Sequence, residues 1–228
     1  MHDPGVTVLP MFPLGAVLLP GEVLPLHVFE PRYRALVQDC LAAPDGPRFG
    51  VVLIARGHEV GGGDERHDVG VVARIVRHEA AADGRSALLC AGEERIRVRE
   101  WLPDDPYPRA DVEEVDDQPL DLAAFDAALP AVLDASGATH ALLVRAAALT
   151  GREPPPFPAL VTALRGGETG DLDHTAISFA LASSGPLGPA DRLRVLAAPD
   201  AAARLGVVAE ALDDANAALA FRLGPEPG

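Results

Sequence analysis

The stretch that decides the fold is residues 9–36, LPMFPLGAVLLPGEVLPLHVFEPRYRAL. An apolar segment at 9–14 precedes Pro20 and Gly21, a pair that favours a turn because proline fixes φ and glycine accepts positive φ. A second apolar segment follows at 23–29. Pro31 comes next, and proline is tolerated in the first turn of a helix, where its missing amide has no partner to lose. The order predicts a strand, a turn, a second strand and a helix.

The helix that begins near Pro31 has one apolar face. Its apolar residues recur at steps of three and four, which places them on one side of a helix. They are Tyr33, Leu36, Val37, Cys40 and Leu41. We expect this face to pack against a core.

Residues up to about 117 read as further strands. Segments rich in β-branched residues and bounded by Gly, Asp or Pro predict strands, and they lie at 48–54, 69–76, 86–90, 95–101 and 110–115. Several short strands with one helix between them suggest a small closed or half-closed barrel, an arrangement that removes sheet edges.

After Asp117 the chain becomes rich in Ala and Leu with helical periods. We expect one helix over 119–135, bent near Pro130, because proline disturbs a helix interior. Further helices are expected at 139–149, 158–165 and 173–182, then one opening near Gly188, and a last one with Asp200 as its N-cap. The predicted class is α+β, with a β-rich domain at 1–117 and an α-helical domain at 118–228.

The sequence resembles the Lon protease amino-terminal (substrate-binding) domain family in four features. They are the order of residues 9–36, the strand at Val69-Gly70, the Asp83-Gly84-Arg85 turn and the segment at 95–98. The resemblance is strongest over 8–100. It implies a PUA-like β-barrel or pseudo-barrel followed by an α-helical bundle. It also implies recognition of other polypeptides.

Composition limits the partners. All 19 basic residues are arginine, and the formal net charge is −15. Acidic residues outnumber arginines in both halves, which argues against nucleic acid and anionic membrane, since both bind through clustered cations. No positively charged leader precedes the first apolar segment, so we expect a cytoplasmic protein. Cys40 and Cys90 match neither a disulfide framework nor metal-ligand spacing, and buried thiols are expected.

The absence of lysine bears on catalysis. A phosphate-binding loop needs Lys-Ser/Thr after its glycines, and a serine-lysine dyad needs a lysine base. Lon proteases continue into ATPase and protease domains, whereas this sequence ends at Gly228. We therefore expect a stand-alone, non-catalytic recognition module with no cofactor and no metal.

The candidate binding residues are Arg95, Arg97, Arg99, Trp101 and Tyr107. The three arginines alternate with apolar residues, so in a strand they project from one face, either as an anion clamp or as a solvated row balanced by nearby acids. Trp101 and Tyr107 are candidates for the wall of an apolar binding surface, although Trp101 equally suits the end of a barrel.

Two other groups of residues carry side chains that occur in metal or catalytic sites. His58, His67 and His78, with the acids between them, supply metal-type donors but match no tight ligand motif, so solvated loop residues are the preferred interpretation. A Ser-His-Asp hydrolase is suggested by residues close together in sequence, Asp173, His174, Ser178, Ser183 and Ser184, but no Gly-x-Ser-x-Gly motif surrounds any serine.

The leading functional hypothesis is binding of unfolded or apolar polypeptide segments, in an adaptor or chaperone-like role, with an ATP-dependent protease as a possible partner. RNA binding by a PUA-like barrel is the alternative, and an unrecognised hydrolase is a third. The acidic charge weighs against RNA.

Overall fold

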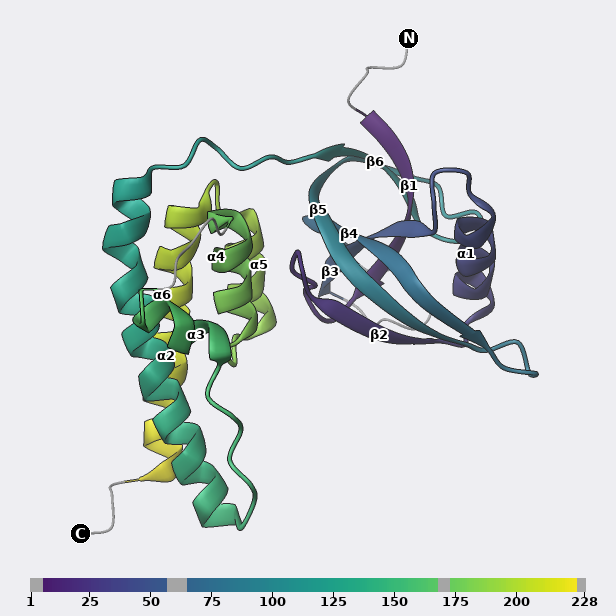
Figure 1. The fold of residues 1–228 in the computed structure, drawn as a ribbon. Coiled ribbons are helices and arrows are strands. Elements are labelled where there is room, and N and C mark those ends of the chain that lie inside the picture. Colours follow the sequence, from purple (N-terminus) through teal and green to yellow (C-terminus); the bar gives the residue numbers. More distant parts are fainter. Residues whose placement is uncertain (1–5, 57–64, 168–172, 225–228) are drawn as a thin grey trace. The chain divides into compact units, whose positions relative to one another are not determined.

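The computed structural model describes residues 6–56, 65–167 and 173–224, and the chain forms two compact units, Met1–Asp116 and Asp117–Gly228 (Figure 1). Among these described residues, the first unit holds the strands and one helix. The second holds the other helices. The predicted α+β arrangement, a β pseudo-barrel followed by helices, is confirmed.

The first unit is a six-stranded sheet that closes on itself. Its strands are β1 (Val6–Leu14), β2 (Val23–Val28), β3 (Arg48–Arg56), β4 (Glu65–Ala80), β5 (Ser86–Leu102) and β6 (Arg109–Glu114). The order is β2-β5-β4-β3-β1-β6, and an additional pairing of β5 with β6 closes the ring. Strands β1 and β3 run parallel, while the other pairs are antiparallel. Strand β2 pairs with β5 alone and stays outside the ring.

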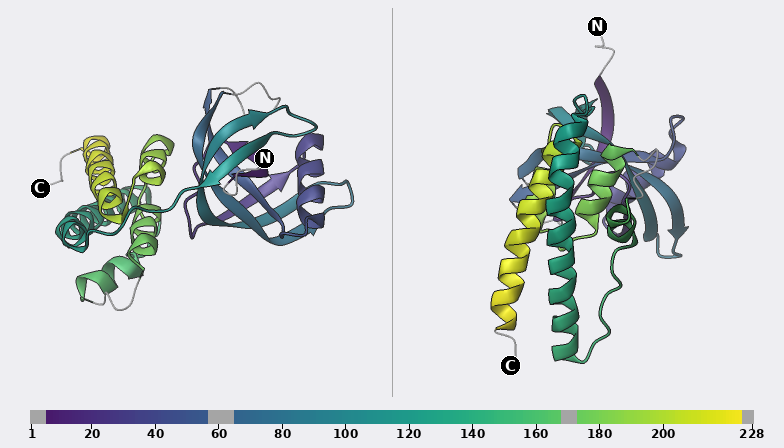
Figure 2. Two further views of the ribbon diagram at one scale, coloured as in Figure 1. Left: turned by 90° about the horizontal axis from the view of Figure 1, so that it is seen from above. Right: turned by 60° about the vertical axis from the view of Figure 1, so that its left-hand side comes forward.

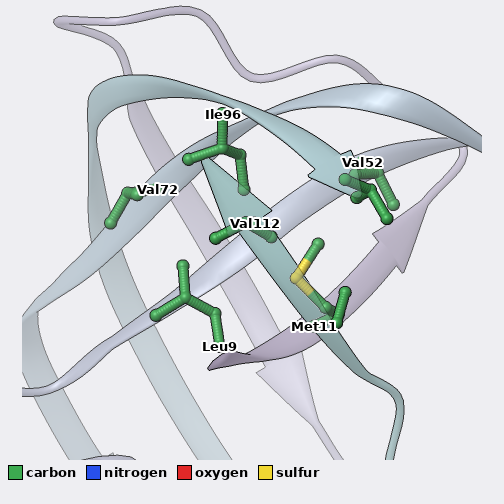
Figure 3. Packing of buried hydrophobic residues seen from close by; sticks show 8 residues of the cluster. Leu9, Met11, Val52, Val72, Ile96 and Val112 are labelled. Carbon is green, nitrogen blue, oxygen red and sulfur yellow. The ribbon is translucent and has the colours of Figure 1, made fainter. Parts of the chain in front are cut away.

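Apolar side chains fill the interior of the barrel (Figure 3). The cluster consists of Leu9, Met11, Val52, Val72, Ile96, Val98, Ala110 and Val112. These residues come from all five strands of the ring and alternate along each strand with residues on the outer face, as the two-residue period of a strand requires. Trp101 packs against the same cluster.

Strand β5 is one long strand where two were expected. Its register against β4 shifts between the pairs Val71↔Arg95 and Ala73↔Gly92, so a bulge takes the place of the expected break. Gly92 serves a close approach, because a Cβ there would lie 2.4 Å from the Leu19 carbonyl oxygen. The glycine thus lets the segment before β2 lie against β5.

Helix α1 (Pro31–Ala42) covers the outer face of the barrel (Figure 2, left). Tyr33 stacks on Phe12 with ring centroids 4.0 Å apart, and Phe12 also contacts Phe49. Cys40 is buried as expected, and burial raises the pKa of its thiol to about 12. Leu41, expected on the same face, is exposed, because its step along the helix turns it away from the barrel.

The second unit contains α2 (Leu122–Thr150), α3 (Ala159–Arg165), α4 (His174–Ser183), α5 (Pro189–Ala197) and α6 (Ala201–Leu223). The prediction of two helices over 119–149 was wrong. Pro130 lies inside α2, and Gly137 does not end the helix. At Gly137 a Cβ would lie 2.5 Å from Nη2 of Arg165, which donates a 2.7 Å hydrogen bond to the Leu133 carbonyl, so the glycine makes room for a cross-helix contact.

Helices α2 and α6 lie side by side over much of their length (Figure 2, right). Thr139 donates a 2.7 Å hydrogen bond to the Asn216 side-chain oxygen, and Asn216 donates to the Ala135 carbonyl. By length and apolar composition α2 resembles a membrane-crossing helix, although helices in the core of a protein share both properties. Asp126, Asp134 and Arg145 interrupt its apolar residues.

A buried arginine ties the start of the second unit to two of its helices. Arg204 on α6 is fully buried and stacks on Phe179 with its guanidinium carbon 3.8 Å from the ring centroid. It donates to both carboxylate oxygens of Asp117, at 2.6 and 3.2 Å, and to the Ser178 hydroxyl at 2.7 Å. Thr175 donates to the same carboxylate. The acceptors compensate for the burial of the arginine charge.

We expect Asp117→Ala to lower the free energy of unfolding of the helical unit by about 3–5 kcal/mol, because it leaves a buried guanidinium without its counter-charge. Urea unfolding followed by the helical circular dichroism signal measures this. The control is Glu210→Ala, which removes an exposed partner of Arg194 and should cost at most about 1 kcal/mol.

A second variant separates loss of the pair from loss of packing. Arg204→Met combined with Asp117→Ala removes both charges and should be more stable than Asp117→Ala alone, because no uncompensated charge remains inside. Equal stability of the single and double variants would contradict this account of the Arg204 contacts.

Candidate functional site

Strands β4 and β5 continue beyond the closed ring and form an antiparallel extension with β2. Residues 86–91 of β5 pair with β2 on one side and with the end of β4 on the other. One face of this extension is covered: Leu88 and Cys90 are buried, and Leu24 and Leu26 are half-buried. The opposite face is open, and its residues alternate with the covered ones.

The open face is apolar along β2 and β5. Val23 is 59% exposed and Leu89 36% exposed. Pro25 lies directly opposite Leu89 in the register, and Val23 lies opposite Ala91. We call Val23, Pro25, Ala87, Leu89 and Ala91 the β2–β5 apolar face. Cross-strand neighbours on one face lie in contact distance of each other, so these residues form one continuous surface.

Charged residues of β4 border this apolar face. Arg74 lies opposite Ala91, and Arg77 lies opposite Leu89. Arg74 pairs with Glu93 at 2.6 Å and Arg77 with Glu79 at 2.5 Å. Exposed pairs of this kind add little stability. Their effect is to give the apolar face a hydrated, charged rim on one side.

A cavity of about 480 Å³ lies at the end of the extension. We call it the tip cavity; its lining residues are His27, Val28, Phe29, Glu79, Ala80, Ala81, Arg85, Ser86 and Ala87. Phe29, which follows β2, is 55% exposed although it is a large apolar side chain. An exposed aromatic ring beside a cavity of this size is suited to contact with an apolar ligand.

A glycine, a side-chain hydrogen bond and a contact with α1 shape the turn that closes the tip. Gly84 has φ +80°, a conformation that glycine adopts without strain. The Arg85 amide donates a 3.1 Å hydrogen bond to the Asp83 carboxylate, and this bond lowers the pKa of Asp83. Arg34 of α1 approaches Gly84 so closely that a Cβ there would lie 1.9 Å from Nη2. The cavity thus lies beside a turn that contacts α1.

The outer edge of β2 is unpaired within the part of the chain that the structure describes. The Gly92 amide donates to the Glu22 carbonyl, so by the alternation of an antiparallel pair the backbone of Val23, Pro25 and His27 faces that free edge. Pro25 has no amide hydrogen there. A proline on an edge strand weakens pairing with a further strand. Contact through the apolar face is therefore favoured over strand addition.

The three arginines predicted as a binding row do not share one environment. Arg95 is only 6% exposed, and its pairing partner Val71 is also buried. Arg97 is exposed, and Arg99 is exposed and pairs with Glu113. A register shift between Val98 and Glu100 interrupts the alternation on which the prediction rested. Arg95 thus departs from the expected solvated row.

Trp101 and Tyr107 also lie in different surroundings. The Arg66 guanidinium carbon lies 4.6 Å from the centroid of the half-buried Trp101 ring, and Trp101 packs on the barrel cluster. Tyr107 is buried and donates a 2.6 Å hydrogen bond to the Asp39 carboxylate of α1. Burial and this bond raise the pKa of Tyr107. Neither residue lines the tip cavity.

The residues of the hydrolase hypothesis are engaged elsewhere. Ser178 is fully buried, donates to the Thr175 carbonyl and accepts from Arg204. His174 packs edge-on against Phe125, with ring centroids 4.8 Å apart. Asp173 caps α4 by accepting from the Thr175 amide. This arrangement explains the three side chains by capping and packing.

Of the histidines weighed as metal ligands, His58 lies outside the described residues. His78 contacts the Ser86 hydroxyl at 3.0 Å. Within residues 6–56, 65–167 and 173–224, no group of three or more His, Cys, Asp or Glu side chains is placed to hold a metal ion.

The sequence reasoning missed the β2–β5 apolar face and the tip cavity. The sequence predicts a strand over residues 23–29, and apolar residues in a strand normally indicate packing. Two signals were available. The first is that β2 has apolar residues on both of its faces, although a strand with only one covered face needs them on that face alone. The second is Pro25, because proline within a strand indicates an edge strand.

Comparison with known proteins gives the chain a family context. A family model described as the ATP-dependent protease La (LON) substrate-binding domain matches residues 8–214. A Lon protease of Anaeromyxobacter dehalogenans is 36% identical over 113 residues, which are 49% of this chain and 13% of that protein. The chain thus spans about an eighth of the length of that relative.

Two solved structures share the fold. The crystal structure of a Lon N-terminal domain protein from Xanthomonas campestris has a TM-score of 0.58 and 27% identity, covering 88% of this chain and 95% of that one. The N-terminal domain of a Mycobacterium avium complex Lon protease has a TM-score of 0.60 and 19% identity, covering 91% of this chain and 99% of that one.

The different surroundings of the arginines lead to a stability prediction. We expect Arg95→Gln to lower the free energy of unfolding by about 1–3 kcal/mol, because it alters a buried polar group and its contacts. Arg99→Gln should cost at most about 1 kcal/mol, because it removes only an exposed pair. Urea unfolding of both variants, followed by tryptophan fluorescence, measures the difference. If Arg95→Gln lowers the free energy of unfolding no more than Arg99→Gln does, within about 1 kcal/mol, Arg95 has no structural role.

Proposed function

Because the chain belongs to the ATP-dependent protease La (LON) substrate-binding domain family, we propose that it binds exposed apolar segments of other polypeptides without cleaving them. The binding surface is the β2–β5 apolar face together with the tip cavity. In a cell, the protein acts as an adaptor or chaperone-like factor in the cytoplasm, presenting such segments to an ATP-dependent protease.

The observation that carries this proposal is the exposure of Val23, Leu89 and Phe29 on one small sheet extension. Proteins seldom leave large apolar side chains together on a surface unless the surface contacts a partner. The apolar face lies beside the tip cavity, so an extended segment has both a surface to lie along and a recess for one side chain. Peptide grooves commonly combine these two features.

The surroundings of the site favour weak and unselective binding. The face is the surface of two paired strands, and its side chains are small or medium in size: Val23, Pro25, Ala87, Leu89 and Ala91. Association loses translational and rotational freedom, so a small apolar surface yields modest affinity. The charged rim of Arg74, Arg77 and Glu79 carries both signs and does not select one client charge.

Charge and side-chain contacts weigh against the alternatives. The net charge of −15 opposes RNA, because nonspecific affinity for nucleic acid depends on phosphate neutralisation. The buried contacts of Ser178 oppose a hydrolase. Polypeptide binding needs neither a cationic surface nor a nucleophile.

We expect a fluorescently labelled apolar peptide to bind the wild-type protein, and Phe29→Ser combined with Leu89→Thr to weaken its binding by about tenfold or more. Loss of buried apolar area at a contact costs about 1.5–3 kcal/mol per large side chain, and about 1.4 kcal/mol is tenfold in affinity. Fluorescence anisotropy measures the dissociation constants, and mass spectrometry checks that the peptide stays intact. Threonine keeps strand propensity at position 89.

The matched control is Phe221→Ser, which removes an 89% exposed aromatic side chain from α6. It should leave peptide affinity unchanged. Wild-type affinity in the Phe29/Leu89 variant, or an equal loss in the control, would contradict the assignment of the binding surface. Absence of any binding at high micromolar peptide would contradict the function itself.

A further inference from the structure

A second cavity, of about 290 Å³, opens at one end of the barrel. We call it the barrel mouth; its lining residues are Thr7, Leu9, Arg48, Val72, Ile96, Val112 and Glu114. All five strands of the closed ring contribute to it. Its floor consists of four members of the interior cluster, which point toward one another in Figure 3: Leu9, Val72, Ile96 and Val112.

The three polar residues of the mouth face inward because of the strand period. Thr7 lies two residues before Leu9, and Glu114 lies two residues after Val112, so each shares the face of an interior residue. Glu114 is also paired directly with Ile96. Arg48 lies two residues before Gly50, where a Cβ would lie 2.4 Å from the Met11 sulfur. The mouth is therefore polar at its rim, and Met11 closes it below.

The polar side chains of the rim have no partners among the residues that the structure describes. Neither the Arg48 guanidinium, the Glu114 carboxylate nor the Thr7 hydroxyl takes part in a hydrogen bond or ion pair there, and Arg48 and Glu114 do not pair with each other. Arg74, opposite Arg48 in the register, differs, because it is bound to Glu93. One cation, one anion and one hydroxyl thus remain available around an apolar recess.

We propose that the barrel mouth binds a free aliphatic amino acid as its zwitterion. The Arg48 guanidinium binds the carboxylate, for which its planar donor pair is suited. The Glu114 carboxylate accepts from the ammonium group, with the Thr7 hydroxyl as a further acceptor. The aliphatic side chain lies against Leu9, Val72 and Ile96. This site is separate from the peptide surface and does not depend on the proposed function.

The size of the cavity supports a small ligand. At about 30 Å³ for each water molecule, the space corresponds to about ten waters, which suits a molecule of about ten heavy atoms. It lies just below the range of about 300–1,000 Å³ that is usual for larger ligands. The mouths of β-barrels are a recurrent place for such sites. A leucine-sized molecule fits these limits.

Titration with L-leucine, followed by amide NMR spectra of the full chain, tests the proposal. We expect saturable shifts of the amides around Gly50, Val72 and Ile96 with a dissociation constant of about 1 mM, since small ligands gain limited free energy for each atom. N-acetyl-L-leucine lacks the ammonium group and L-leucinamide lacks the carboxylate. Each should bind at least about tenfold more weakly than leucine.

Variants assign the two charges. Arg48→Gln should weaken leucine binding at least about tenfold, because the carboxylate loses its partner. Glu114→Gln should weaken binding of leucine and of L-leucinamide, which both carry the ammonium group, and leave binding of N-acetyl-L-leucine unchanged. The matched controls are Arg99→Gln and Glu100→Gln, which change exposed charges on β5 that do not line the cavity. Both should bind leucine as the wild type does.

Two results would overturn the proposal. The first is a lack of saturable shifts with leucine at ten times the expected dissociation constant. The second is equal binding of leucine and its two blocked derivatives, which would show that only the apolar recess is used. Both results are measured on the wild-type protein, so they remain decisive even if a variant fails to fold. Peptide binding by the β2–β5 apolar face is measured separately and is not affected by either result.

Discussion

The shared strand β5 is the constraint on which the first unit depends. Its second half, paired with β4 and β6, closes the barrel, and its first half leaves the ring and holds β2. The bulge near Gly92 allows one strand to take part in both the ring and the extension, because a bulge bends a strand and increases its twist. The barrel mouth and the β2–β5 apolar face both follow from this division, since one lies inside the ring and the other on the part that leaves it.

The two surfaces differ in the chemistry they offer. The apolar face is open and bordered by charges that already pair with each other. Such a surface gains affinity mainly from apolar area and discriminates little between sequences. The barrel mouth is small, and its polar side chains have no partners in the described residues. A site of this kind discriminates by shape and charge, because a ligand that leaves its polar groups unmatched loses affinity.

Sequence patterns predicted the order of the elements because turn residues and apolar periods are local signals. The helix begins at Pro31 as expected, and the Asp200 N-cap is confirmed by its hydrogen bond to the Ala203 amide. The errors occur at Gly92 and Gly137, because the sequence predicts that a strand ends near the first and a helix near the second. Each instead admits a distant group, the Leu19 carbonyl or the Arg165 guanidinium. The burial of Arg95 and the exposure of Leu89 likewise depend on contacts distant in sequence.

The contacts of Asp117 have a mechanical consequence. The Val115 amide is hydrogen-bonded to Arg95 in the barrel, while the Asp117 carboxylate is held by Arg204 and the Gln118 amide by the Pro199 carbonyl. Only Asp116 lies between these anchors. Tension applied to the chain from the barrel side therefore reaches the Arg204 ion pair before it reaches the backbone hydrogen bonds of α2. The Arg204–Asp117 ion pair therefore bears such a load ahead of α2 and protects the first turn of this long helix from it.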